Sequence, residues 1–140
     1  MQTFLPYADY KASAAVLDPK RLGKQRVETL QLLNANVHGT QHRFHPAAKM
    51  WKKHTNALVA YGLVICKEWK MRGNKDDTYH KIEAFTIGDG SFDYPKWFGD
   101  ERLHSNHRAR LLEKYPLWYD EFGWKEKPVL KNFWPLEGLL

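Results

Sequence analysis

The stretch LDPKRLGKQRVE, residues 17–28, concentrates charged and amide side chains of types that could do chemistry. Its four cations are Lys20, Arg21, Lys24 and Arg26. Such cations can hold a phosphate backbone, and the neighbouring Gln25 and Glu28 could orient a substrate, move a proton or stabilise positive charge on a sugar. The alternative is a solvated helix face, on which a Lys24–Glu28 pair contributes only a few tenths of a kcal/mol. Periodicity alone does not separate the two interpretations.

A helix is needed to bring these side chains onto one face. The dipeptide Asp18-Pro19 is a helix-start signal, because the acid can cap the helix and proline suits its first position. Apolar residues then recur at helical spacing as far as a glycine at position 39. We therefore expect a helix from residue 19 to about residue 36. On it Arg21, Gln25 and Glu28 fall at positions i, i+4 and i+7 and share a face.

Three histidines lie in and beside the expected loop GTQHRFHP, at His38, His42 and His45. Their spacing could hold a metal ion, but no acid lies nearby and Cys66 is the only thiol, so a metal site is disfavoured. A loop that contacts phosphate through Arg43 and the imidazole rings agrees better with this composition. Lys49, just beyond the loop, would extend the same track.

A second basic strip lies in ERLHSNHRARLLEK, residues 101–114, which Asp100 could cap as a helix. Its members are His104, His107, Arg108 and Arg110. These side chains could contact phosphates. His107 could equally be a core histidine with satisfied hydrogen bonds, and the sequence favours neither interpretation.

Five aromatic residues follow within KYPLWYDEFGW, residues 114–124. The ordinary interpretation is core packing. Rings such as Trp118 and Tyr119, close to a basic helix, would also suit a stacking platform for a disrupted or extruded base.

Composition indicates the class of partner. Twenty-two Lys and Arg against 16 Asp and Glu give a net charge of +6, and aromatic residues make up 14% of the chain, so nucleic acid is the leading candidate. No apolar run approaches the ~20 residues of a membrane span, and MQTFLPYADY lacks the features of a signal peptide. The single cysteine excludes an internal disulfide and fits a reducing cytoplasm. We expect a cytoplasmic, nucleoid-associated monomer without cofactor, metal or membrane partner.

The apolar pattern predicts an all-α fold. After an extended N-terminal segment and the first helix, a second helix should run from Pro46 to the RGN segment, with Gly73 just past its end. A third should cover residues 101–114, and a short turn should begin at Pro116. A chain of 140 residues suits one core. We therefore predict one compact domain, 1–140, of three main helices with long loops.

Several of these stretches together resemble the pyrimidine-dimer DNA glycosylases of the phage endonuclease V type and their bacterial homologues. The resemblance covers most of the chain and depends on the order and spacing of LDPKRLGKQRVE, FHPAAKMW, YGLVICKEWKMRG and LHSNHRARLLEKYPLWYDEFGW. It implies a compact three-helix fold with the N-terminal segment inserted between helices. It also implies binding to kinked duplex DNA with a base flipped out of the stack.

The resemblance further implies a mechanism, in which the N-terminal α-amine attacks the deoxyribose C1′ and expels the base. The resulting imine then permits β-elimination without a metal. An α-amine suits this role because more of it is neutral at pH 7 than of a lysine side chain. Gln2 is bulky, so removal of the initiator methionine should be poor and Met1 would carry the amine. The family's glutamate is expected between Arg21 and Arg26, where this chain has no acid, and Glu28 is the nearest candidate.

The resemblance therefore implies a DNA glycosylase, with or without lyase activity, acting on a damaged or modified base such as a pyrimidine dimer in duplex DNA. Met1, Gln25 and Glu28 are the expected catalytic residues. The expected DNA-binding residues are Arg21, Lys24, Arg26, Arg43, His45, Lys49, His104, His107, Arg108, Trp118 and Tyr119. One alternative is a non-catalytic DNA- or RNA-binding module that uses the same basic face. Another is a small enzyme acting on modified nucleotides.

Overall fold

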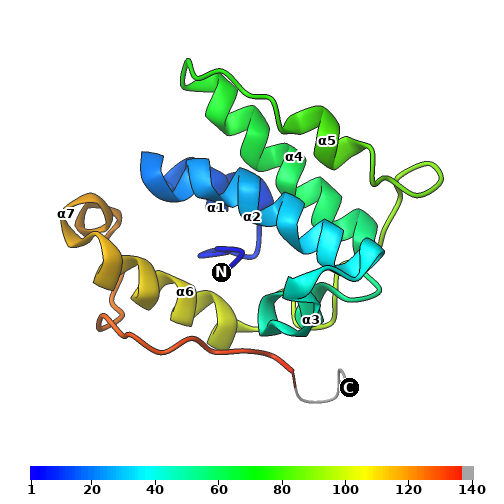
Figure 1. The fold of residues 1–140 in the computed structure, drawn as a ribbon. Helices are drawn as coiled ribbons and strands as arrows, with labels where there is room; N and C mark the ends of the chain where they lie inside the picture. The colour runs from blue at the N-terminus through cyan, green and yellow to red at the C-terminus, as the bar shows by residue number, and fades with distance from the viewer. Residues whose placement is uncertain (137–140) are drawn as a thin grey trace.

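The computed structural model describes residues 1–136, which form seven α-helices and two short 3-10 helices (Figure 1). The three longest are α2 (Pro19–His38), α4 (Thr55–Met71) and α6 (Glu101–Lys114). The others are α1 (Tyr10–Val16), η1 (Gln41–Phe44), α3 (Pro46–Trp51), α5 (Tyr79–Glu83), α7 (Pro116–Tyr119) and η2 (Asp120–Phe122). Because residues 1–136 contain no strand, the predicted all-α fold with three main helices is confirmed. None of these helices is both long and apolar enough to cross a bilayer.

The ends of α2 and α6 follow from local capping. The Asp18 carboxylate accepts a hydrogen bond from the Arg21 amide, and Gly39 ends α2 in the left-handed region at φ 67°. At α6 the side chain of Asp100 accepts from the Arg102 amide. These caps confirm the predicted start and end of α2 within two residues and the predicted bounds of α6.

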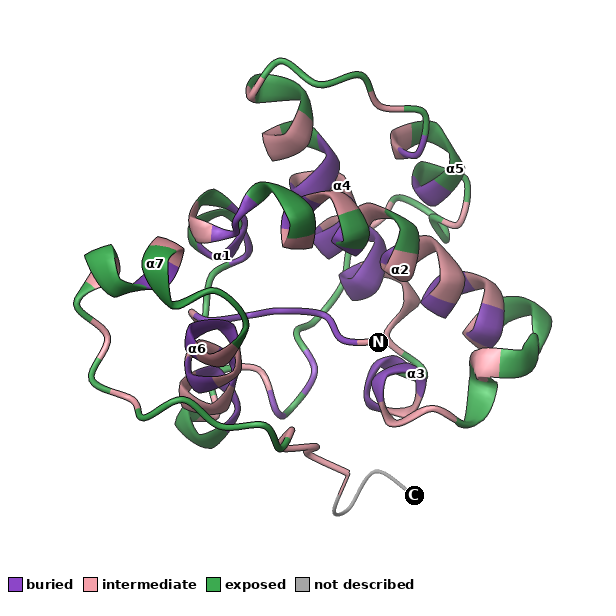
Figure 2. Cartoon of the chain, turned by 60° about the vertical axis from the view of Figure 1, so that its left-hand side comes forward, coloured by how far each residue is buried: buried purple, intermediate pink, exposed green. Residues whose placement is uncertain are grey.

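The first six residues form an extended segment that runs between the helices (Figure 2). Residues 2–6 are all buried, with Leu5 fully so. Side chains from α2, α3, α4 and α6 hydrogen-bond to this segment. The expected insertion of the N-terminal segment between helices is therefore confirmed.

The predicted second helix is wrong in one respect, because the structure divides it into α3 and α4. Lys53 between them has φ 69°, a left-handed conformation that ends α3. Because of this break, α3 and α4 point in different directions. Trp51, at the end of α3, is thereby fully buried, and its indole N–H donates to the Thr3 hydroxyl at 2.9 Å.

Two short helices, α1 and α5, were not predicted from the sequence. Helix α1 is capped by Asp9, whose carboxylate accepts from the Ala12 amide at 2.7 Å. Helix α5 lies in the segment expected to be loop and places Ile82 in the core. Beyond η2 the chain runs without regular structure along α6, where the Phe133 amide donates to the Asn106 side chain. Phe133 and Trp134 are half-buried there, as expected for a tail packed through aromatic rings.

Helices α2 and α4 approach closely at Gly62. A Cβ atom at this position would stand 2.6 Å from Cγ2 of Thr29 and 3.0 Å from Cδ1 of Ile82. Neither neighbour is the end of a long flexible side chain. The absence of a side chain at Gly62 therefore sets the spacing of the two helices.

We expect Gly62→Ala to lower the free energy of unfolding by about 1–3 kcal/mol, because the new methyl group overpacks the α2–α4 contact. Urea denaturation measures the change. Adding Thr29→Ser, which removes the methyl group nearest to the new Cβ, should recover part of the loss. A Gly62→Ala protein as stable as the parent would contradict the close approach.

Candidate active site

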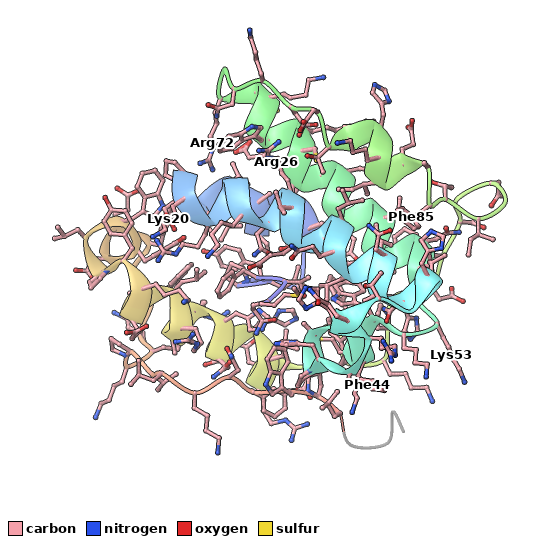
Figure 3. All side chains as sticks on the ribbon, viewed as in Figure 1. Lys20, Arg26, Phe44, Lys53, Arg72 and Phe85 are labelled. Carbon is pink, nitrogen blue, oxygen red and sulfur yellow. The ribbon has the colours of Figure 1, made fainter. Side chains whose placement is uncertain are left out.

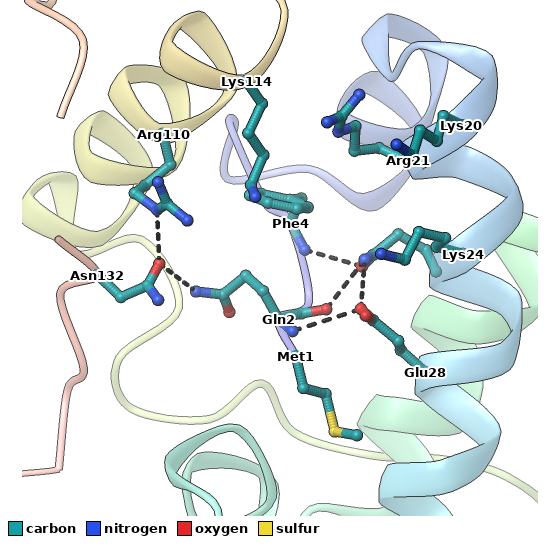
Figure 4. A pocket seen from close by; sticks show the side chains of 11 residues that line it. Met1, Gln2, Phe4, Lys20, Arg21, Lys24, Glu28, Arg110, Lys114 and Asn132 are labelled. Carbon is teal, nitrogen blue, oxygen red and sulfur yellow. Dashed lines mark hydrogen bonds between the residues drawn. The ribbon is translucent and has the colours of Figure 1, made fainter. Parts of the chain in front are cut away.

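A pocket of about 280 Å³ opens between α2, α6 and the N-terminal segment (Figure 4). Five side-chain cations line it: Lys20, Arg21, Lys24, Arg110 and Lys114. Glu28 is the single acid among the lining residues. Met1, Gln2, Phe4, Gln25 and Asn132 complete the lining. Five cations around one carboxylate favour an anionic ligand.

Gln25 holds the N-terminal segment to α2. Its side chain is almost fully buried, and its Oε1 accepts from the Phe4 amide at 3.0 Å. Its Nε2 donates to the Gln2 carbonyl and to Glu28 Oε2, both at 3.0 Å. The Tyr61 hydroxyl also contacts Gln25 Oε1, at 2.7 Å. The amide thus fixes both the backbone of the segment and the carboxylate beside it.

The carboxylate of Glu28 lies against the start of the chain. Besides the bond from Gln25, its Oε2 accepts from the backbone amide of Gln2 at 3.4 Å. That amide belongs to the residue next to Met1, which also lines the pocket. Glu28 is therefore placed within one residue of the α-amine, on the same helix face as Gln25, as the spacing predicted.

The side chain of His45 also lies near the N-terminal amine. Partial burial lowers its pKa, and the nearby positive N-terminal amine and His42 lower it further. Its Nδ1 accepts from the Ala47 amide and caps α3. The surroundings of His45 therefore favour its neutral form. This imidazole lies near the amine, between the start of the chain and the first turn of α3.

Buried side chains fix the residues beyond Phe4. The Leu5 amide donates to Nδ1 of His107 at 2.8 Å, and Leu5 O lies 2.7 Å from Nδ1 of His104. The guanidinium of Arg108 donates to the Pro6 carbonyl at 2.8 Å. Each of these three α6 residues thus contacts the segment backbone.

This geometry corrects the DNA-binding role expected for three members of the basic strip of α6, His104, His107 and Arg108. His104 and His107 are buried, and burial lowers the pKa of His107 to about 3. Arg108 forms ion pairs with Glu101 and Glu126. These side chains hold the N-terminal segment and do not lie free at the surface.

Arg26 also lies away from the pocket. Its guanidinium is ion-paired with Asp76 and stacks over the Trp69 ring at 4.5 Å, on the side of α2 that faces α4 (Figure 3). Asp76 in turn accepts from the amides of Thr78 and Tyr79. Arg26 therefore orders the segment before α5, in place of the expected DNA contact.

The aromatic pair expected to stack on a base belongs to the core. Tyr119 is fully buried, and its hydroxyl donates to the Asp18 carboxylate at 2.6 Å. Trp118 is half-buried and donates to the Val16 carbonyl. The first contact ties α7 to the start of α2 and the second ties it to the end of α1, so the structure supports the core-packing interpretation for these rings.

The remaining expected DNA-binding residues fall into two groups. Arg21 and Lys24 line the pocket with Met1, Gln25 and Glu28. Arg43 and Lys49 lie in a different hollow, at the other end of α2. Within residues 1–136 no group of His, Cys, Asp or Glu side chains forms a potential metal site.

Sequence reasoning missed Lys114 and Asn132 as pocket residues. Lys114 lies four residues after Arg110 on α6, so helical spacing could have indicated that both face α2. Partial burial lowers the pKa of Lys114, and Arg110 and Arg21 lower it further. Asn132 carried no sequence signal. Its Oδ1 accepts from Arg110 Nε at 3.0 Å and from the Gln2 side chain at 3.4 Å.

We expect His107 to make the stability of the protein depend on pH. Its folded pKa of about 3 lies below the unfolded value near 6.5, so its contribution is complete above pH 6.5 and is lost as the pH falls toward 3. The slope should be at most about 1.4 kcal/mol per pH unit. In His107→Asn the amide oxygen can still accept from the Leu5 amide but does not titrate. Urea denaturation between pH 7 and 4.5 should show a shallower slope for the variant, and equal slopes would contradict this assignment.

Gln25→Glu tests the amide between the segment and Glu28. The new carboxylate would lie about 3 Å from that of Glu28, and two such groups cannot both ionise easily. The raised folded pKa predicts a stability loss relative to the parent that grows as the pH rises above about 4.3. Denaturation at pH 5 and pH 8 measures it. Gln25→Ala, the control, should destabilise by about 1–3 kcal/mol at both pH values because it leaves buried backbone groups unpaired.

The chain was compared with curated proteins, solved structures and family models. No curated protein and no solved structure matches it. The model of one family, described as pyrimidine dimer DNA glycosylase, matches residues 1–82. The match includes the N-terminal segment, α2, α3 and α4, and with them Met1, Gln25 and Glu28. The chain therefore belongs to the pyrimidine dimer DNA glycosylase family.

Proposed function

We propose that the protein is a DNA glycosylase that excises the base at a pyrimidine dimer in duplex DNA, with the α-amine of Met1 as its nucleophile. The observation that carries the proposal is the pocket itself. It brings the first two residues, one carboxylate and five side-chain cations into a space of about 280 Å³. That volume, and a lining that is mainly polar, suit a sugar and its flanking phosphates better than a large apolar ligand.

The reaction begins when the neutral amine attacks C1′ of the damaged nucleotide. A bond forms between the amine nitrogen and C1′, and the glycosidic bond breaks, so that the base leaves with the bonding electrons. Glu28 accepts the proton that the amine nitrogen loses. The C1′–O4′ bond of the sugar ring then breaks, O4′ takes up the proton held by Glu28, and a protonated imine forms between Met1 and the sugar.

The imine makes strand cleavage possible in a second step. Loss of a proton from C2′ to a base at the site breaks the bond to the 3′ phosphate, which leaves as a phosphate monoester. Glu28 and His45 are the bases near the amine. Arg21, Lys24 and Lys114 would stabilise the negative charge of the flanking phosphates.

We propose that the damaged nucleotide is flipped out of the helical stack. The position of the amine among α2, α6 and the N-terminal segment supports this, because an extruded nucleotide would bring C1′ within its reach. The matched residues 1–82 supply the nucleophile and the acid, whereas α6 and the tail supply Arg110, Lys114 and Asn132. We therefore propose that the chain works as one glycosylase unit, and that a monomer suffices.

Borohydride trapping tests the nucleophile. The untagged protein is incubated with a duplex that contains an abasic site, the imine is reduced, and the linked peptide is mapped by mass spectrometry. We expect the link at Met1. A Gly-Ser extension before Met1 should abolish trapping and leave duplex affinity within about twofold, because the pocket cations remain. A link at Lys114 would displace the proposed nucleophile, and excision that survives the extension would refute it.

Glu28→Gln tests the acid. It should lower the single-turnover rate of excision by about 10²–10⁴-fold, which is the usual contribution of a positioned acid or base. Duplex binding should stay unchanged or tighten, because one negative charge is removed. Glu121→Gln, at an exposed acid in η2, is the matched control and should keep the parent rate. A protein that binds duplex DNA but cleaves no glycosidic bond at a dimer, with or without these changes, would be the non-catalytic binding module.

A further inference from the structure

A second basic hollow lies at the C-terminal end of α2, whereas the active-site pocket lies toward the N-terminal end of this helix. It has a volume of about 650 Å³ and lies among the end of α2, η1, α3 and the turn after α3. Its four cations are Arg43, Lys49, Lys52 and Lys53, and the residues that line it include no acid. We call it the distal groove. Lys53 and Phe44 mark it in Figure 3, in which Lys20 marks the other end of α2.

The lysines of the distal groove are available for a ligand. Arg43 donates to the carbonyls of Gly39 and Thr40 at 3.0 and 3.2 Å and so offsets the negative end of α2. None of the ion pairs found among residues 1–136 involves the three lysines. Arg43 therefore has a structural partner, whereas the positive charges of the lysines have no counter-charge in the groove.

The turn that carries Lys52 and Lys53 is costly to form. A lysine with φ 69° is less stable there than glycine or asparagine by about 1 kcal/mol. Glycine would make the same break in the helix without strain but would carry no charge. Next to this turn Phe44 is 68% exposed, with the Arg43 guanidinium 4.4 Å above its ring. Strain and an exposed ring beside uncompensated cations point to a binding surface.

The distal groove is aligned with the active-site pocket along α2. Arg21, Gln25 and Glu28 line the pocket, and Ala35 and Gly39 line the groove. Positions 28, 35 and 39 continue the same three- and four-residue spacing, so α2 presents both sites on one side. Twelve residues separate the middles of the two sets, which corresponds to about 18 Å along the helix axis. That distance equals about five base pairs of duplex DNA.

We propose that the distal groove binds the phosphate backbone of duplex DNA about five base pairs from the nucleotide in the active-site pocket. It supplies affinity for undamaged duplex through Lys49, Lys52 and Lys53 and takes no part in the chemistry. The inference takes only the identity of the polyanion from the proposed function. DNA is favoured because a second anionic contact in line with the first matches a long, regularly charged ligand.

The experiment compares the intact protein with the triple variant Lys49→Gln/Lys52→Gln/Lys53→Asn. Asparagine is chosen at position 53 because it tolerates the left-handed backbone. Affinity for an undamaged duplex of about 24 base pairs is measured over a range of salt concentrations. The slope of log K against log salt should fall by about 2–3, which is about 0.9 for each lost phosphate contact. The single-turnover excision rate at saturating protein should stay within about twofold of the parent.

The matched control is Lys67→Gln/Lys70→Gln/Lys75→Gln, which removes the same charge from exposed lysines of α4 and the segment after it. This control should keep the parent slope. On a duplex with an abasic analogue, shortening one arm to about four base pairs should remove the difference between the groove variant and the parent. That result would support the five-base-pair spacing.

Three outcomes would overturn the proposal: an unchanged slope in the groove variant, an equal loss in the control, or loss of binding to phosphatidylserine vesicles with duplex affinity intact. The last would assign the groove to a membrane surface. Failure of the glycosylase proposal gives a different result. In that case the parent protein cleaves no glycosidic bond, while its affinity for undamaged duplex still depends on the groove lysines.

Discussion

The hydrogen bonds between helix side chains and the backbone of residues 2–6 are the interaction on which the rest of the structure depends. An extended segment inside a helical domain has no ladder partner, and each buried backbone group left unpaired would cost about 1–3 kcal/mol. Gln25, Tyr61, His104 and His107 supply the missing partners from α2, α4 and α6. The polar residues of this core are therefore explained by the segment that they hold, and the three main helices are arranged around it.

Fixing the segment also fixes the electrostatics at its start. Once residues 2–6 are held, Met1 must lie where α2 and α6 face each other, among Lys20, Arg21, Lys24, Arg110 and Lys114. These like charges repel one another. Asp18 pairs with Arg21 and Glu113 with Arg110, and among the lining residues only Glu28 offers a further negative charge. A folded protein keeps such a group when a ligand supplies the opposite charge. In the proposed function the phosphates of DNA supply this negative charge. DNA binding would then stabilise the folded protein against the repulsion among the cations.

Local signals in the sequence were sufficient for part of the fold. The cap at Asp18, the glycine at position 39 and the shared face of Gln25 and Glu28 depend on neighbours within one or two turns, so they could be predicted. The break at Lys53 could not, because lysine does not favour a left-handed backbone and the conformation is compensated by the burial of Trp51.

Burial was the part of the candidate site that the sequence did not reveal. His104, His107, Arg108 and Tyr119 were expected at the DNA because their types suit that role, but a residue type does not show which face of a helix is covered. Lys114 was missed although its helical spacing from Arg110 places both on one face of α6.

The acid of the candidate site is displaced along α2 from the place that the resemblance gives it. Gln25 occupies the region where the resemblance places a glutamate. Its amide oxygen accepts a hydrogen bond from the N-terminal segment, and its amide nitrogen donates to that segment and to Glu28. Side chains three residues apart on a helix are neighbours, so an acid at position 28 still reaches the first peptide group of the chain. In the proposed mechanism Gln25 holds the N-terminal segment and Glu28 accepts the proton.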